Sequence, residues 1–118
     1  MPMNYGNAVC KYVREGRAKV GPSAWVPLVS SGTTPLSNRQ WIEIQHRGQG
    51  ALALAYANIN SDGTTFTTPT HSAQASKIIP ANSIKVEPLT DKVNLYGRFV
   101  GKAGTSAGGT KVIVTEYA

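Results

Sequence analysis

At 118 residues the chain has the length of one domain with a single hydrophobic core. Its one cysteine excludes an internal disulfide and a thiolate metal cluster, and no run of about 18 apolar residues predicts a membrane span. The net charge of +6 would attract either an acidic protein surface or a nucleic acid, so charge alone excludes neither partner.

The N-terminal segment, residues 1–20, holds the densest positive charge in the chain, with four basic residues against the single acid Glu15. Its pattern fits a short strand over residues 9–13 and a turn at 15–16. We predict that it forms a basic arm, solvated or extended onto a neighbouring subunit, and that residues 21–118 form the folded domain. The residues expected to contact a partner are Lys11, Tyr12, Arg14, Arg17 and Lys19.

Residues 24–29 predict a short strand at the edge of a sheet. Pro27 lies inside this run, and proline, which has no backbone N–H to donate, is confined to edge strands and bulges. Residues 30–37 are rich in serine and threonine and predict a loop.

Two strands and a tight connection are predicted in the middle of the chain. In residues 40–47 apolar and polar side chains alternate, with Ile42 and Ile44 on one face, which is the pattern of a half-buried strand. Residues 51–57 alternate as strictly, so we predict a strand there although their alanines favour helix. Because only residues 48–50 separate the two runs, the pair predicts a hairpin.

Turns and short strands alternate in the next part of the chain. Residues 58–75 are rich in threonine and contain a turn at 60–63, after which Phe66 is expected to point inward. Residues 76–80 and 83–88 predict two further strands.

The chain ends in two longer strand patterns, residues 92–100 and 111–117. The glycine-rich run 101–109 lies between them, so we predict a closing hairpin with Val112 and Val114 buried. Altogether the pattern contains about seven to nine short antiparallel strands at roughly ten-residue spacing. It predicts an all-β, single-domain β-sandwich or jelly-roll-like barrel.

Residues that could carry catalysis or hold a metal are few and scattered. Residues 97–102 come near a phosphate-binding loop, but they are one residue short and are followed by alanine where a serine or threonine is required. His46 and His71 have no second metal ligand at a useful spacing, and the surrounding sequence gives Cys10 no activating base. We therefore expect no enzyme activity, no catalytic residue, no cofactor and no metal.

One strand combines an aromatic side chain with basic neighbours. Trp41 alternates with Arg39 and Arg47 on one face of the strand predicted over residues 40–47. Proteins that bind single-stranded nucleic acids stack bases on such aromatics. Nucleic-acid binding is therefore a possible function, although burial of Trp41 in the core is the simpler interpretation.

Four segments between Arg39 and the C-terminus follow one another in a recognisable order, with a strand of small residues after the first. They are Arg39-Gln-Trp-Ile-Glu-Ile-Gln-His-Arg-Gly48, Ile78-Ile-Pro-Ala-Asn-Ser83, Val93-Asn-Leu-Tyr-Gly-Arg98 and Gly108-Gly-Thr-Lys-Val-Ile-Val-Thr-Glu-Tyr117. This order resembles the small β-sandwich virion accessory proteins of tailed bacteriophages, of the capsid decoration or cement type.

The resemblance implies a non-enzymatic structural protein that binds and stabilises the phage head shell. It implies the major capsid protein or other virion subunits as partners, a dimeric or trimeric homo-oligomer, and a place in the virion after assembly in the host bacterial cytoplasm. Two alternatives remain open. One is a nucleic-acid-binding β-sandwich. The other is a tail or head-fibre component that binds receptor sugars through the loops at Thr64–Thr70 and Thr105–Gly109.

Overall fold

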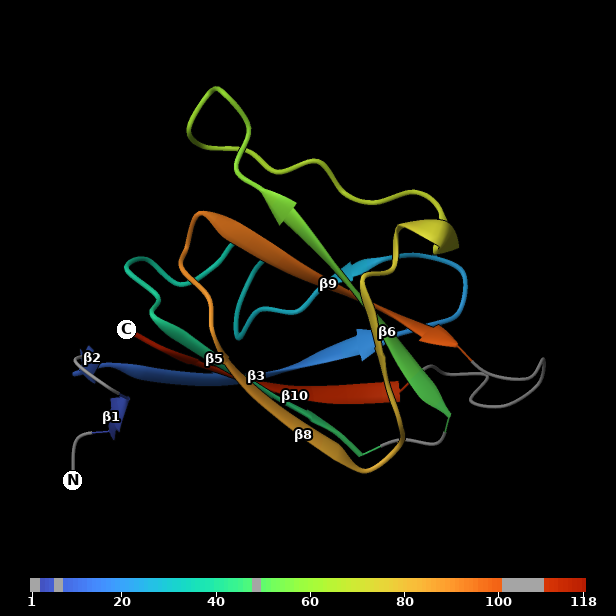
Figure 1. The fold of residues 1–118 in the computed structure, drawn as a ribbon, viewed down its shortest axis with the longest axis horizontal. Helices are drawn as coiled ribbons and strands as arrows, with labels where there is room; N and C mark the ends of the chain where they lie inside the picture. Colours follow the sequence, from blue (N-terminus) through green and yellow to red (C-terminus); the bar gives the residue numbers. More distant parts are fainter. Residues whose placement is uncertain (1–2, 6–7, 48–49, 101–109) are drawn as a thin grey trace.

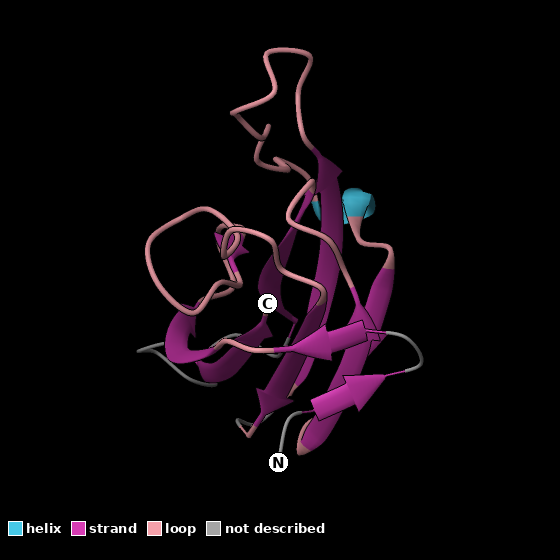
Figure 2. Ribbon diagram, turned by 90° about the vertical axis from the view of Figure 1, so that its left-hand side faces the viewer, coloured by secondary structure: helices cyan, strands magenta, loops and turns pink. Residues whose placement is uncertain are grey.

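The computed structural model describes residues 3–5, 8–47, 50–100 and 110–118. Eight strands of this part of the chain form two four-stranded antiparallel sheets that pack face to face, and two more form a small hairpin at the N-terminal end (Figure 1). The structure thus confirms the predicted all-β sandwich. The loop after β6 rises from one end of the sandwich in both Figure 1 and Figure 2.

The first sheet has the strand order β3-β10-β5-β8, and the second has the order β4-β9-β6-β7. The hairpin consists of β1 and β2, and a single turn of 3-10 helix, η1, follows β6. The bounds are β1 Met3–Tyr5, β2 Ala8–Cys10, β3 Val13–Val20, β4 Val26–Pro27, β5 Trp41–His46, β6 Ala51–Asn58, η1 Ser72–Gln74, β7 Lys77–Ile79, β8 Ser83–Pro88, β9 Val93–Val100 and β10 Thr110–Tyr117.

The strands pair as if one long hairpin had been rolled up. The innermost pair in the sequence is β6 with β7. The pairs β5 with β8, β4 with β9 and β3 with β10 follow outward, so that each pair encloses the previous one in the sequence. Rolling then brings β10 beside β5 and β9 beside β6, which completes the two sheets. This nesting is the arrangement of a jelly roll, in which two sheets share eight antiparallel strands.

Two predicted hairpins are wrong, although their strands are present. β5 lies in the first sheet and β6 in the second, and β9 and β10 are separated in the same way. Alternation identifies a strand but carries no information about its partner, so proximity in the sequence suggested the wrong pairing. Residues 48–49 and 101–109, which were expected to form the two turns, lie outside the described residues.

The main core lies between the two sheets and is closed by alternate side chains from each. In β5 the buried positions alternate with partly exposed ones. Ile42, Ile44, Val112 and Val114 are buried, as predicted. Pro27 lies in the two-residue edge strand β4, also as predicted. The buried members of this core are Ala18, Val20, Leu28, Ile42, Ile44, Leu52, Leu54, Leu95, Phe99, Val112 and Val114.

A second, smaller apolar cluster lies on the outward side of the second sheet, beneath the loop that follows β6. Trp25, Ala53, Ala55 and Tyr96 form it. The indole N–H of Trp25 donates to the carbonyl oxygen of His71, at 3.1 Å, and so holds the returning part of the loop over the sheet. The outward side of the second sheet is therefore covered in part by the protein's own chain.

Residues 1–20, predicted as a basic arm, include the β1–β2 hairpin and all of β3. β3 pairs with β10 along its eight residues, so the basic side chains that it contains are presented by a sheet. The turn predicted at Glu15–Gly16 is wrong, because both residues lie inside this strand. Gly16 serves a close approach instead: a Cβ atom built there would lie 1.9 Å from the carbonyl oxygen of Ser30.

Candidate functional site

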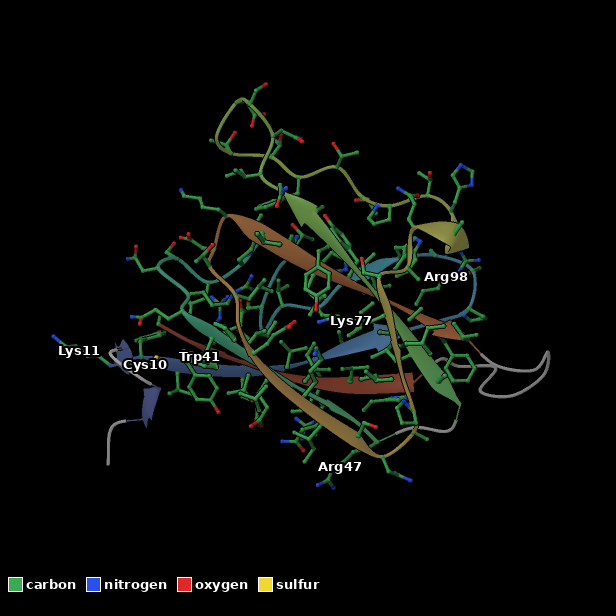
Figure 3. The ribbon with its side chains drawn as sticks, viewed as in Figure 1. Cys10, Lys11, Trp41, Arg47, Lys77 and Arg98 are labelled. Carbon is green, nitrogen blue, oxygen red and sulfur yellow. The ribbon has the colours of Figure 1, made fainter. Side chains whose placement is uncertain are left out.

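Two of the predicted contact residues, Lys11 and Tyr12, lie between β2 and β3. Their backbone N–H groups both donate to the carbonyl oxygen of Ala118, at 2.8 and 2.9 Å, and Ala118 donates back to Tyr12 at 2.8 Å. The C-terminal residue thereby fixes the chain just before β3, while both side chains are exposed. Lys11 stands at the end of the molecule nearest the N-terminus, well apart from Arg47 (Figure 3).

The other three predicted contact residues divide between the two faces of β3. Arg14 points inward, where its Nε donates to the hydroxyl of Ser30 at 2.5 Å, so its part in the structure is internal. Arg17 and Lys19 are exposed on the opposite face. The five residues therefore do not form one patch.

The outward side of the first sheet, called the outer face below, exposes apolar side chains from both of its edge strands. Val13 on β3 is 56% exposed, and Ile84 and Val86 on β8 are 65% and 39% exposed. Trp41 and Ile113, on the two central strands, are half-buried between them. The apolar side chains thus extend across the four strands from one edge of the sheet to the other.

One end of the outer face is basic. Cross-strand pairing places Arg17 opposite Ile113, and Ile113 opposite Gln45, which pairs with Ile84. Lys19 lies two residues beyond Arg17 on the same side of β3, and the exposed Arg47 follows β5 at this end. Glu15 and Glu43 lie in the next cross-strand row of the same face, so the positive charge is confined to this end, beside the apolar side chains.

The most deeply buried charged group is the carboxylate of Glu116, on the inward side of β10. It accepts hydrogen bonds from the backbone N–H and the hydroxyl of Ser30, at 2.7 and 2.6 Å, and from the backbone N–H of Leu36 at 2.9 Å. Nη1 of Arg39 lies 2.9 Å from Oε2, and Nη2 of Arg14 lies 3.4 Å from Oε1. Burial opposes ionisation, but the hydrogen bonds from Leu36 and Ser30 and the charge of Arg39 outweigh it and hold the pKa of Glu116 below its usual value.

Arg39 is the partner of Glu116 and is equally buried, with no exposed side-chain surface. Its Nε donates to the carbonyl oxygen of Leu89 at 3.0 Å, and its Nη2 donates to those of Thr90, at 3.0 Å, and Val93. Burial lowers the pKa of Arg39, and the Coulombic attraction and hydrogen bond of Glu116 oppose that shift. The pair joins β10 to the loop after β4 and to the turn between β8 and β9, so we assign it to the structure.

Burial of Arg39 also removes part of the predicted nucleic-acid surface. Its guanidinium lies inside the sandwich, so it does not form a basic frame with Trp41 and Arg47. Arg39 lies before the first residue of β5, at the end of a loop, so the alternation of the strand does not determine whether its side chain points inward or outward. The predicted arrangement of an aromatic between two surface arginines is therefore wrong.

A second polar cluster closes the side of the sandwich between β6, β7 and β8. The hydroxyl of Tyr56 donates to Oε1 of Glu87 at 2.5 Å, and burial, followed by the hydrogen bond and charge of Glu87, raises the pKa of Tyr56. Nζ of Lys77 and of Lys85 lie 3.7 and 3.6 Å from Oε2 of Glu87. Lys77 also lies 5.6 Å from the centre of the Tyr56 ring, as a cation over an aromatic face. These inward charges join the two sheets at their edge.

The residues considered for metal binding or nucleophilic catalysis lie apart. His46 is buried at the end of β5 and donates from Nε2 to the carbonyl oxygen of Gly50 at 2.8 Å, while Cys10 is buried beyond the other end of the sheet. Within the described ranges no three histidine, cysteine, aspartate or glutamate side chains gather to hold a metal ion. The same part of the chain contains no helix long and apolar enough to cross a membrane.

A hollow of about 450 Å³ lies between the loop after β4 and the loop after β6, over the outward side of the second sheet. It is called the threonine pocket below, because five of its lining residues are threonines. The strands supply a floor of one proline, one amide and one tyrosine. The lining residues are Pro27, Thr33, Thr34, Thr64, Thr65, Phe66, Thr68, Asn94 and Tyr96.

Asp62 fixes the loop that forms one wall of this pocket. Its Oδ1 accepts from the backbone N–H groups of Thr64 and Thr65, both at 2.9 Å, and its Oδ2 accepts from the hydroxyl of Thr65 at 2.5 Å. The turn predicted at residues 60–63 is present, with Gly63 at a φ of 75°. The local pattern of Asx and glycine residues was enough to predict it.

The carboxyl of Asp62 is expected to titrate near pH 2. The hydrogen bond from the Thr65 hydroxyl, with those from the backbone of Thr64 and Thr65, lowers its pKa from 3.8 to about 2. A depressed carboxyl pKa means that the order of this loop is present at neutral pH and is lost as the pH falls through the folded-state value. Carbon-detected NMR of the side chain measures the midpoint, and Thr65→Val should move it back towards 3.8. A midpoint of 3.8 in the unaltered protein would contradict this assignment.

Comparison with known proteins adds no identification. No protein-family model matches the chain, and neither a curated protein nor a solved structure shows significant similarity to it.

Proposed function

We propose that this protein is an accessory structural protein of a tailed-bacteriophage head, which binds the shell through its outer face and stabilises it by binding alone. The observation that carries the proposal is the combination on that face of exposed apolar side chains at both edges with a basic end. Exposed apolar patches rimmed by polar residues mark sites of protein–protein interaction. The major capsid protein or another virion subunit is the partner that we propose.

Charge selects the kind of surface that the outer face fits. Arg17, Lys19 and Arg47 stand at one end of the face, and the whole chain carries a net charge of +6. Complementary charge on the partner would steer association and fix its register, while the apolar side chains supply the buried contact. We therefore propose an acidic surface of a shell subunit as the occupant.

The fold and the sheet edges are compatible with assembly. Jelly rolls occur in viral capsid domains, which supports the proposal by analogy of fold. β8 is an edge strand paired on one side only, with β5, so its other backbone edge can pair with a second copy of the chain. We include a dimer or trimer in the proposal, which light scattering of the purified protein would measure.

Co-sedimentation with phage heads that lack the protein tests the docking surface. We expect the wild type to sediment with the heads and the double variant Ile84→Ser/Val86→Ser to bind at least about tenfold more weakly, as for central apolar contacts of an interface. The matched control is Ile78→Ser, because Ile78 is also an exposed isoleucine, 61% exposed, but lies on β7 in the second sheet. It should bind as the wild type does.

A charge-reversal pair tests the basic end of the face. Arg17→Glu/Lys19→Glu should weaken binding, and Lys92→Glu, which reverses an exposed lysine in the turn before β9, should not. Raising the salt concentration should weaken the binding of the wild type to the heads, and it should weaken the binding of the Arg17/Lys19 variant less. Unchanged co-sedimentation of both outer-face variants would refute the docking surface.

A further inference from the structure

We propose that the threonine pocket is a binding site for a neutral glycan, in which one or two sugar rings enter between the loops after β4 and β6. This site lies on the second sheet and is separate from the outer face, so the inference stands independently of the proposed function. A concave site with an apolar wall and a few convergent polar groups is the usual form of a small-ligand pocket.

The volume and the charge of the pocket narrow the class of ligand. Its 450 Å³ is within the range of small-molecule sites. Its nine lining residues include no lysine, arginine, histidine, aspartate or glutamate. A charged ligand would leave water without a counter-charge, which is costly, so the pocket favours an uncharged one.

The polar groups of the pocket match the hydroxyls of a sugar. The side chains of Thr33, Thr34 and Thr68 are exposed at its wall, and a threonine hydroxyl can both donate and accept a hydrogen bond. Sugar hydroxyls have the same two-way capacity. A ligand with many hydroxyls could therefore satisfy several of these groups together.

The floor and one wall supply apolar contact. Phe66 is half-buried in the loop after β6, and Pro27 of β4 lines the same pocket. The C–H faces of a sugar ring pack against aromatic and proline rings, because these surfaces are flat and apolar. An aromatic side chain beside several hydroxyls favours a carbohydrate over a wholly apolar ligand, whose contact would desolvate the threonine hydroxyls without replacing their hydrogen bonds.

The pocket is built before any ligand arrives. Nδ2 of Asn94, a buried residue, donates to the carbonyl oxygen of Thr33 at 3.1 Å and to the hydroxyl of Tyr96 at 3.3 Å, which ties the β4 loop to the floor. That tyrosine hydroxyl retains a proton of its own to donate. The opposite wall is held by Asp62 and by the bridge between Ile59 and Phe66. Such preorganisation lowers the entropy cost of binding.

A glycan array bearing neutral, sialylated and phosphorylated oligosaccharides, followed by saturation-transfer NMR with each retained sugar, tests the site. We expect retention of neutral glycans, with no gain from sialic acid or phosphate. Phe66→Ala, which removes the packing surface, and Thr34→Val, which removes one hydroxyl on the other loop at constant shape, should each weaken binding by up to about tenfold. Ser61→Ala is the matched control, since Ser61 is exposed in the same loop but does not line the pocket.

The variants also separate a folding defect from a binding defect. Thr34 lies in an exposed loop, so its variant should keep the wild-type thermal unfolding midpoint even where Phe66→Ala does not. Three results would each overturn the proposal. They are no retention of any neutral glycan, a preference for the charged glycans, and binding that survives both substitutions.

Discussion

Glu116→Gln should lower the free energy of unfolding by about 3–5 kcal/mol, because it removes the charge that neutralises a buried arginine. The carboxylate lies 2.9 Å from Nη1 of Arg39, and neither side chain is exposed. Glutamine keeps the shape, but its amide N–H₂ replaces an oxygen that accepts from Ser30 or Leu36. The substitution therefore leaves both a buried charge and a buried N–H group without a partner.

Urea unfolding followed by tryptophan fluorescence measures this loss. Glu15→Gln is the matched control: Glu15 is also a glutamate on the β3–β10 ladder, opposite Thr115, but it points to solvent. Its variant should change the free energy of unfolding by less than about 0.5 kcal/mol. Equal stability of Glu116→Gln and the wild type would contradict the structural role of the pair.

The stabilisation by Glu116 should depend on pH with a defined sign. The folded-state pKa of Glu116 lies below its ordinary value of 4.5, at which the unfolded chain is expected to titrate. The contribution is therefore complete above the unfolded-state pKa and is lost as the pH falls through the folded-state pKa. The wild type should lose stability in acid through this group, and Glu116→Gln should lack that part of the dependence.

The double variant Arg39→Met/Glu116→Leu distinguishes charge pairing from hydrogen bonding. Replacing a buried ion pair by apolar side chains is often neutral. Here, however, Arg39 also satisfies three backbone carbonyls and Glu116 satisfies two backbone N–H groups. We therefore expect the double variant to remain destabilised, because those five backbone groups would lose their partners.

The strands themselves could be predicted from the sequence, because apolar and polar residues alternate within them. β5 and β8 show it most clearly, and the edge position of β4 followed from Pro27. For β8, however, the pattern does not say which side is inward. The structure turns Lys85 and Glu87 towards the interior, where Tyr56, Lys77 and Lys85 all contact the carboxylate of Glu87. Ile84 and Val86 are left exposed.

The pairing of the strands could not be predicted in the same way. β3 and β10 are neighbours although nearly the whole sandwich lies between them in the chain, and no local pattern records that contact. The pair of Arg39 and Glu116 depends on the same long-range arrangement, since their separation in the sequence is 77 residues. The sequence showed a basic segment and a strand that contains an aromatic residue. Which of their side chains are exposed depends on the long-range pairing of the strands, which no local pattern contains.

The threonine pocket shows an intermediate case. The turn at residues 60–63 and the threonine-rich character of the loop were visible in the sequence, and sugar binding through Thr64–Thr70 was one of the open alternatives. The other wall, at Thr33 and Thr34, comes from a loop that the sequence presents only as polar. The second loop predicted to contact sugars, Thr105–Gly109, lies outside the described residues.

Among glycine-to-alanine substitutions at the described positions, Gly16→Ala is expected to be the most disruptive. It should lower the free energy of unfolding by at least about 3 kcal/mol. The added Cβ would lie 1.9 Å from the carbonyl oxygen, 2.7 Å from the carbonyl carbon and 3.0 Å from the Cα of Ser30. These are backbone atoms, so no rotation of a side chain relieves the contact. Residue 30 must move, and its N–H and hydroxyl are the groups that bind Glu116.

Gly21→Ala is the control that isolates this contact. Gly21 follows β3 five residues after Gly16, its φ is not positive, and a Cβ built there meets nothing within 4 Å. Alanine at this position reduces the freedom of the unfolded chain without strain in the folded one, so Gly21→Ala should stabilise by about 0.4–1 kcal/mol. Urea unfolding of the two variants should thus give shifts of opposite sign. If Gly16→Ala were as stable as the wild type, β3 and the loop that carries Ser30 would not approach each other as closely as the structure shows. The hydrogen bonds from Ser30 to Glu116 would then also have to differ from those described.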